Sequence, residues 1–151
     1  MARAKYQVLV LPYKKLDDEI LYCIFKRSDI GVWQFIAGGG EDEDTSPLIS
    51  AKREAYEEAH ISSDAKYDSL ETKCSISTEC FKAARLAWGE SCLVIPEYCF
   101  AVEIADGKID ISQEHTCFEW VDYQTAVQRL KYDSNKVALW ELENKISLGM
   151  I

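Results

Sequence analysis

The 151-residue chain has little positive charge, no long apolar run and no closely paired cysteines. Its 17 lysines and arginines are outnumbered by 26 aspartates and glutamates, which gives a formal net charge of -9. Such a chain is poorly suited to binding nucleic-acid polymers through their phosphates, whereas a small phosphorylated ligand can bind through bridging divalent cations. No segment approaches the roughly 20 apolar residues of a membrane span. We therefore expect no nucleic-acid polymer and no membrane among its partners.

The six cysteines are scattered along the chain, and none forms a C-x-x-C pair. Several lie in apolar, strand-like runs, where cysteine acts as a small hydrophobic residue. This pattern favours reduced thiols over disulfides or a zinc site. Residues 1–13 have too short an apolar core for a signal peptide and contain Pro12. We therefore expect a cytoplasmic protein.

The apolar pattern predicts one α/β (α+β) domain over residues 1–151, with helices packed against a mixed sheet. Runs rich in β-branched residues predict a hairpin of strands 5–13 and 20–28 around a turn at 16–19. Residues 67–104 are expected to be mostly extended, with a looser stretch at 81–91. The other expected elements are an extended piece at 31–40, strands at 69–78, 92–104 and 117–123, an Asp-Gly hairpin turn at 105–108, and helices at 123–131 and 134–146.

Residues 46–60 are predicted to form a helix. Ser46 can cap its start, and Pro47 suits its first turn. One face carries small apolar residues at helical spacing, which indicates close packing on a sheet. These residues are Leu48, Ala51, Ala55 and Ala59.

Three glutamates of this helix fall within little more than one turn. Because a helix advances about 100° per residue, Glu54 and Glu58 lie about 40° apart, and Glu57 lies about 60° to the other side of Glu54. The three carboxylates are therefore expected to converge on one patch, where hard oxygen ligands suit Mg²⁺ or Mn²⁺. The alternative is a solvated acidic face with Lys52 and Arg53 as partners.

The residues around the acidic helix favour the metal site over the solvated face. A glycine-rich turn precedes the helix, and its backbone amides at Gly39 and Gly40 can approach a phosphate closely. Arg53 comes directly before Glu54 and therefore points to another side of the helix. There it can brace the loop instead of neutralising the metal ligands.

The stretch from Gly39 to Ile61 resembles the signature of the Nudix hydrolase family. That signature is G, five residues, E, seven residues, R-E, an apolar residue, any residue, E-E, any residue, G and an apolar residue. Residues 53–61, "REAYEEAHI", supply its second half. The resemblance implies an α/β/α sandwich with a mixed sheet, in which Arg53 supports the loop and the glutamates 54, 57 and 58 hold Mg²⁺. Water would then cleave a phosphoanhydride bond of a nucleoside diphosphate joined to another group.

Two positions depart from this signature. Thr45 stands where its first Glu is expected, and His60 stands where its second Gly is expected. In the family that Glu mainly supports the loop geometry, so Glu43 or Asp44 could stand in for it. His60 suits a helix end because His tolerates positive φ better than most residues, and a ligand role is the alternative.

Residues 32–47, 94–104 and 114–146 resemble the dATP or dihydroneopterin triphosphate pyrophosphohydrolases of this family. By this resemblance Glu114 would join the metal site or help to activate water. Lys26 and Arg27 would reach substrate phosphate, and Lys5 is a weaker match for the same role. Glu114 could instead cap a loop, and Lys26 and Arg27 could be solvated charges. Since neighbours in a strand point to opposite faces, one of that pair is expected to face the cleft.

Together these features predict a Mg²⁺-dependent pyrophosphohydrolase that converts a nucleoside or pterin triphosphate to a monophosphate and pyrophosphate. Glu54 and Glu58 are the first choices as metal ligands, and the general base could be Glu58, Glu57 or Glu114. The alternatives are hydrolysis of dinucleoside polyphosphates or nucleotide sugars, and a Nudix domain that binds nucleotide without catalysis. A monomer and a homodimer are both compatible with the sequence.

Overall fold

The structure, a computed structural model, describes residues 2–105 and 108–151. Its helices are α1 (Pro47–Ala59), α2 (Lys82–Trp88), α3 (Tyr123–Arg129) and α4 (Asp133–Ser147), and a 3-10 turn, η1, spans Thr78–Cys80. Its strands are β1 (Arg3–Leu16), β2 (Glu19–Arg27), β3 (Trp33–Gln34), β4 (Ile36–Glu41), β5 (Lys66–Ser77), β6 (Val94–Glu103) and β7 (His115–Val121).

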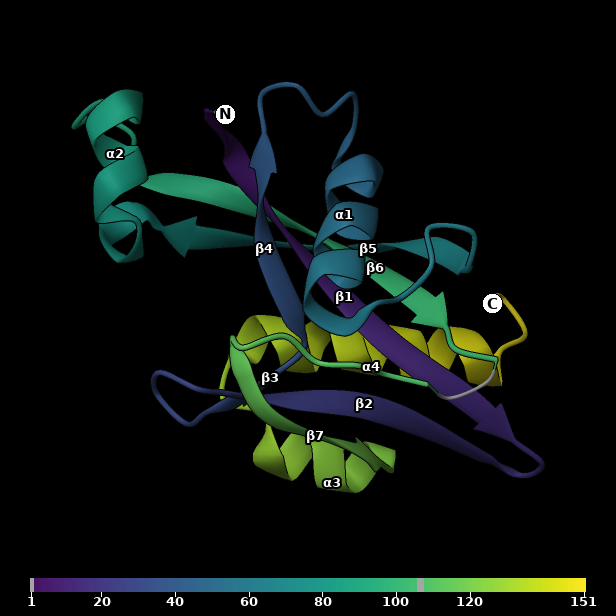
Figure 1. The fold of residues 1–151 in the computed structure, drawn as a ribbon. Helices are drawn as coiled ribbons and strands as arrows, with labels where there is room; N and C mark the ends of the chain where they lie inside the picture. The colour runs from purple at the N-terminus through teal and green to yellow at the C-terminus, as the bar shows by residue number, and fades with distance from the viewer. Residues whose placement is uncertain (1, 106–107) are drawn as a thin grey trace.

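The seven strands form one mixed sheet around the long strand β1 (Figure 1). The main order is β3-β2-β1-β6-β5, while β4 pairs with β1 and β7 pairs with β2. The predicted β1–β2 hairpin is confirmed, because Tyr13 pairs with Tyr22 and Leu16 with Glu19. One half of β1 pairs with β4 and the other half with β2, whereas β6 runs parallel to β1. Strands β4 and β2 therefore follow one another along the same edge of β1.

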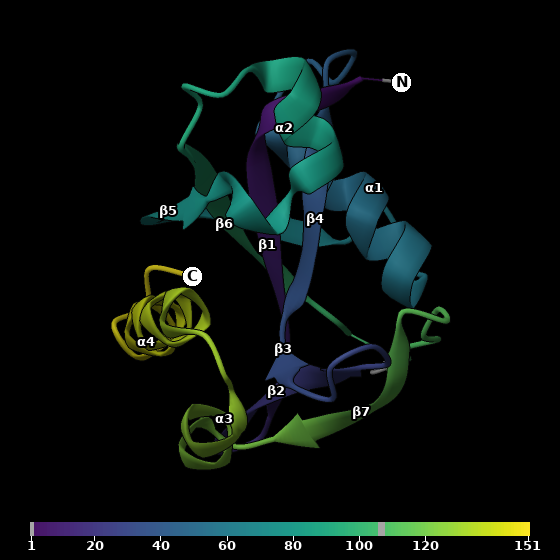
Figure 2. The same ribbon diagram turned by 90° about the vertical axis from the view of Figure 1, so that its left-hand side faces the viewer.

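Helices cover both faces of this sheet, as expected for an α/β/α sandwich (Figure 2). On one face Val8 and Val10 pack in a buried cluster with the alanines of α1. On the other face Leu9 and Leu11 share a cluster with buried residues of α4, including Leu139. Successive residues of β1 thus point to opposite layers, as the period of a strand requires. The predicted fold class is confirmed.

The stretch 81–91 differs from the sequence-based expectation of loose structure. Residues 82–88 form the helix α2, and none of its residues is buried. Alanine, leucine, lysine and arginine dominate this segment and are strong helix formers. Because α2 has no buried face, its sequence lacks the apolar periodicity of a packed helix. The helix was therefore not predicted from the sequence.

The hairpin turn predicted at 105–108 falls partly on Asp106 and Gly107, which lie outside the described residues. The strands on either side of it do not pair with each other, because β6 pairs with β1 and β5 whereas β7 pairs with β2. The segment between them instead passes the end of α1, where the Ser112 amide donates to the Glu58 carbonyl at 2.9 Å. This path brings residues 112–114 to the acidic helix.

All six cysteines are free thiols. No helix in the described part of the chain combines the length and apolar character needed to cross a membrane.

Candidate active site

Helix α1 is held at both ends by local contacts that the sequence predicted. The Ser46 hydroxyl accepts a hydrogen bond from the Ile49 amide at 3.4 Å, and Pro47 occupies the first turn. His60 ends the helix in the left-handed region with φ 54°. The buried alanines, including Ala55, let the helix lie close to the sheet. The helix therefore presents its acidic face to β4 at a fixed rotation.

The three glycines 38–40 lie in strand β4, and the prediction of a glycine-rich turn is wrong. Their role is steric. A Cβ on Gly38 would lie 2.2 Å from Cδ of Glu54, and a Cβ on Gly39 would lie 2.5 Å from Cζ of Arg3. Because real side chains do not approach so closely, the glycines make room for these two charged groups on opposite faces of β4.

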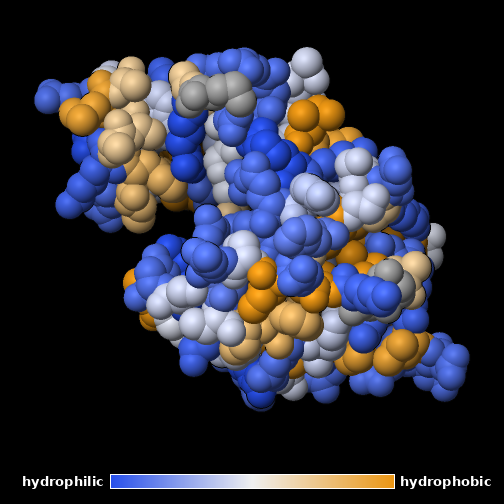
Figure 3. Space-filling model, in the orientation of Figure 1, coloured by the Kyte–Doolittle hydropathy of each residue, from blue (hydrophilic) through white to orange (hydrophobic). Residues whose placement is uncertain are grey.

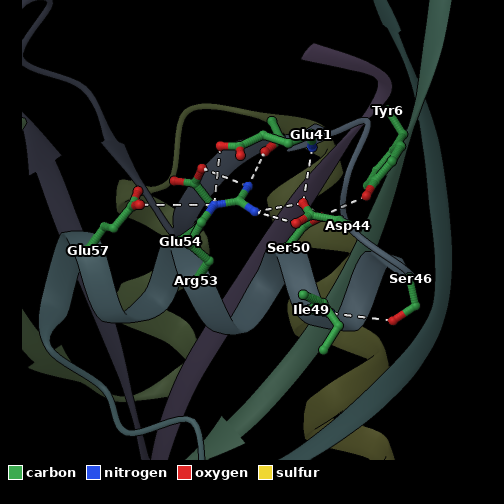
Figure 4. Close-up of polar contacts among 10 residues, drawn as sticks. Tyr6, Glu41, Asp44, Ser46, Ile49, Ser50, Arg53, Glu54 and Glu57 are labelled. Atoms are coloured by element: carbon green, nitrogen blue, oxygen red, sulfur yellow. Dashed lines mark hydrogen bonds and ion pairs between the residues drawn. The ribbon is translucent and has the colours of Figure 1, made fainter. Parts of the chain in front are cut away.

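Arg53 binds the loop that joins β4 to α1 (Figure 4). Its Nη1 lies 2.7 and 2.6 Å from the two carboxylate oxygens of Asp44, and its Nη2 donates to the Gly39 carbonyl at 2.9 Å. Asp44 also accepts from the Glu41 amide at 3.0 Å and from the Ser50 hydroxyl. Arg53 thus braces the loop, while its distance to the nearer oxygen of Glu54 is 3.6 Å.

A cleft of about 1110 Å³ opens beside β4, and Figure 3 shows it as the hollow between the α2 region and the β2–β3 region. Glu54, Glu58 and Glu114 all line it, together with Arg27. The segment carrying Glu114 is tied to β2, because the Ser28 amide donates to the Glu114 carbonyl at 2.9 Å. The cleft thus joins carboxylates from two distant parts of the sequence.

The electrostatics of this acidic end are unfavourable for three bare carboxylates. Burial, and then the neighbouring Glu114 carboxylate, raise the pKa of Glu58 to about 10. Burial and the Glu57 carboxylate raise the pKa of Glu54 to about 7, and Arg53 only partly opposes them. Each raised pKa means that the ionised carboxylate is destabilised by burial and has too little positive charge nearby. A bound cation would supply that compensation.

The residues present fit a divalent cation. Oε2 of Glu58 is buried and has no hydrogen-bond partner, so one carboxylate oxygen is free to coordinate. No group of three His, Cys, Asp or Glu side chains within residues 2–105 and 108–151 forms a ready-made metal cage. A Mg²⁺ ion held here would therefore keep several waters and share its coordination sphere with substrate phosphates.

Four of the residues predicted to bind metal or phosphate do not line the cleft. Glu57 has a side chain 59% exposed, and its carboxylate lies 4.0 Å from Arg53. Lys26 is turned away because it alternates with Arg27 along β2. Lys5 is exposed and lies in a smaller hollow beside α2, and a Cβ on Gly40 would meet Tyr6 instead of the cleft. Of the predicted phosphate-contacting residues, the cleft contains only Arg27 and Gly39 within the described chain.

Comparisons with known proteins identify the family of this chain. A family model described as "NUDIX domain" matches residues 7–140. The chain belongs to the Nudix family. It is 30% identical over 136 residues to the dihydroneopterin triphosphate diphosphatase of Haemophilus influenzae, and the match covers 87% of this chain and 83% of that protein. The Escherichia coli protein of the same name is 26% identical over 133 residues, covering 87% of each chain.

Solved structures show the same fold. A candidate NUDIX hydrolase from Listeria monocytogenes superposes with a TM-score of 0.86 at 38% identity, covering 97% of both chains. The dihydroneopterin triphosphate pyrophosphohydrolase of E. coli gives a TM-score of 0.73 at 22% identity, covering 92% of this chain and 94% of that one. The protein is a Nudix hydrolase, a member of a family that generally uses divalent metal ions.

The Nudix signature departs from its usual form at Thr45, and the structure shows which neighbouring acid contacts Arg53. The exposed Glu43 has no contact with Arg53 in the described structure, whereas Asp44 binds it through both carboxylate oxygens. An acid one position earlier in the loop thus makes the bracing contact. The departure at His60 is accommodated by its left-handed backbone.

A polar group formed by Arg3, Gln7 and Glu97 lies in the cleft and was not predicted from the sequence. The Gln7 Nε2 donates to Glu97 at 3.1 Å, and Arg3 donates to the Gln7 Oε1 at 3.0 Å. The sequence pattern of β6 could have indicated this group, because Glu97 shares one face of the strand with the buried residues Ile95 and Cys99. A charged residue at an inward-facing strand position is rare unless it has partners or a function.

Proposed function

We propose that this Nudix hydrolase is a Mg²⁺-dependent pyrophosphohydrolase that splits a nucleoside or pterin triphosphate into a monophosphate and pyrophosphate. The observation that supports this most is that Glu54, Glu58 and Glu114 line one cleft of nucleotide size and interact electrostatically with one another. The names of the H. influenzae and E. coli relatives point to a pterin triphosphate as one substrate. Mn²⁺ is the expected substitute metal, since it prefers the same oxygen ligands.

In this proposal Glu54 and Glu58 hold the cation, and Glu114 adds a third carboxylate from the residue before β7. The ion would neutralise phosphate charge and lower the pKa of a bound water. Arg27 lies in the same wall as Glu114 and faces the cleft, so its guanidinium is placed to bind a phosphate oxygen. Its present partner is Asp29, which accepts from Nε at 2.9 Å. Substrate would take over part of that contact.

The test is the identity of the products from a substrate panel with Mg²⁺. The panel contains dihydroneopterin triphosphate, the (d)NTPs, dinucleoside polyphosphates and nucleotide sugars. We expect pyrophosphate and a monophosphate from at least one triphosphate. Release of orthophosphate, or turnover of dinucleoside polyphosphates alone, would contradict the proposal, and nucleotide binding without turnover would indicate a binding-only domain.

Glu58→Gln separates catalysis from folding. We expect turnover to fall by at least about 100-fold, because a metal ligand and a candidate base is lost while the shape of the side chain is kept. Glu71→Gln is the matched control, since that side chain is 86% exposed on β5. Equal activity of Glu58→Gln and wild type would refute the role of Glu58.

A further inference from the structure

The cleft is also lined by a buried carboxylate, that of Glu97, with one oxygen that has no hydrogen-bond partner. Glu97 lies in the central strand β6, lines the cleft and is only 2% exposed. Its Oε2 accepts from Gln7, whereas its Oε1 is buried and has no hydrogen-bond partner. Ser134 at the start of α4 is a second donor to this carboxylate, and Oε1 still lacks a partner. One acceptor of a cleft-lining side chain is therefore unpaired.

The orientation of this carboxylate is fixed by its neighbours. Arg3 Nη2 donates to the Gln7 Oε1 at 3.0 Å, so the Gln7 amide nitrogen must point to Glu97. Gln7 and Glu97 are also directly paired across β1 and β6. The Arg3 guanidinium lies 4.4 Å from the centre of the Phe81 ring, and Phe81 lines the cleft. An oriented acceptor and a flat aromatic surface thus occur around Arg3.

An open, buried carboxylate oxygen costs free energy until a donor reaches it. Burial raises the pKa of Glu97, and the hydrogen bonds from Gln7 and Ser134 act in the opposite direction. A carboxylate is best matched by two parallel N–H donors, as in a guanidinium. Among neutral heterocycles, a 2-amino-4-oxopyrimidine ring presents such a pair, a ring N–H beside an amino group. Guanine and pterins contain this ring.

Adenine and cytosine present a different edge. Each places an amino group beside an unprotonated ring nitrogen, whose lone pair would face the carboxylate. Uracil and thymine offer a single N–H between two carbonyl oxygens. A site with a carboxylate at this position therefore discriminates among bases by hydrogen bonding as well as by shape.

We propose that Glu97 determines specificity by accepting hydrogen bonds from the 2-amino-4-oxopyrimidine edge of the substrate, so that pterin and guanine triphosphates are preferred to those of adenine and cytosine. This rests on the proposed function, because the triphosphate must extend toward Glu54 and Glu58. The cleft volume of about 1110 Å³ accommodates both parts of such a ligand.

The first test compares kcat/KM for dGTP and dATP in the wild type and in Glu97→Gln. We expect the wild type to prefer dGTP by about 10- to 100-fold, the range of a good bidentate contact. The variant should lose or reverse this preference, because a glutamine amide can pair with adenine through one donor and one acceptor. Glu103→Gln on the same strand, outside the cleft, should retain it. Equal use of both nucleotides by the wild type, or an equal loss for both in Glu97→Gln, would overturn the assignment.

The second test measures binding without turnover. Calorimetric titrations with GMP, IMP and AMP in EDTA should give affinities in the order GMP, IMP, AMP, because IMP lacks only the 2-amino group. GMP selectivity without any triphosphate hydrolysis would refute the proposed function and, with it, the substrate preference, and would leave only the base recognition by Glu97. Equal binding of GMP and AMP would refute the inference even if triphosphates are hydrolysed. These wild-type titrations decide the matter should Glu97→Gln fail to fold.

Discussion

Adding one methyl group at Gly38 should displace a proposed metal ligand without changing any charge. In Gly38→Ala the new Cβ would lie 2.2 Å from Cδ, 2.3 Å from Oε2 and 2.5 Å from Cγ of Glu54. Ordinary carbon contacts are about 3.5–4.0 Å, so the carboxylate must move by more than about 1 Å. A misplacement of that size costs about 100-fold in rate. Because Glu54 can swing away as a side chain, we expect the fold to survive.

The assay is steady-state turnover of the best triphosphate substrate, together with the Mn²⁺ affinity measured by calorimetry. Gly39→Ala is the matched control, since its methyl group would meet Arg3 on the opposite face of β4. We expect Gly38→Ala to lose turnover and Mn²⁺ affinity, and Gly39→Ala to retain Mn²⁺ affinity. Normal turnover in Gly38→Ala would show that the position of Glu54 is unimportant and would refute the reasoning.

Two further substitutions test the contacts that hold the site and α4 in place. Asp44→Asn should lower the free energy of unfolding by about 1–3 kcal/mol, because hydrogen bonds between charged groups are lost; denaturant titration measures this. Glu141 accepts from Lys145 at 2.8 Å and from the Thr72 amide at 2.8 Å. Burial acts to raise its pKa, but these hydrogen bonds lower it from 4.5 to about 2. Its contribution is therefore present above about pH 4.5 and lost as the pH falls toward 2, and Glu141→Gln should remove this part of the acid dependence of the melting temperature.

The controls for these two substitutions come from the same regions. Glu43→Gln, next to Asp44 but exposed, should leave stability unchanged; an equal loss in both variants would show that Arg53 is not the relevant partner. For Glu141, the melting temperature should fall less steeply between pH 4.5 and 2 in the variant than in the wild type. The same fall in both proteins would disprove the assigned pKa shift.

The sequence predicted the elements whose residues follow a strict period. Val8 to Leu11 alternate between two buried layers, and Ala51 and Ala55 recur at helical spacing, so β1 and α1 were both recognisable. Helix α2 was missed because its residues are not buried and carry no period. The glycines of β4 were read as a turn, since their steric role depends on partners such as Glu54 that only the tertiary structure brings near.

The candidate site was predictable where its residues are close in sequence. Helical geometry placed Glu54 and Glu58 together, but it could not show that the Glu57 carboxylate turns toward Arg53. Glu114 came from the family resemblance alone, because 56 positions separate it from Glu58. The Gln7–Glu97 pair depends on the parallel pairing of β1 with β6, and strand order cannot be read from local patterns.

The most direct measurement is anomalous diffraction from crystals of the protein soaked in Mn²⁺. We predict a manganese peak in the cleft, within coordination distance of Glu54 and Glu58, that disappears in Glu58→Gln. A peak elsewhere, or an undiminished peak in the variant, would contradict the claim that these glutamates hold the catalytic cation.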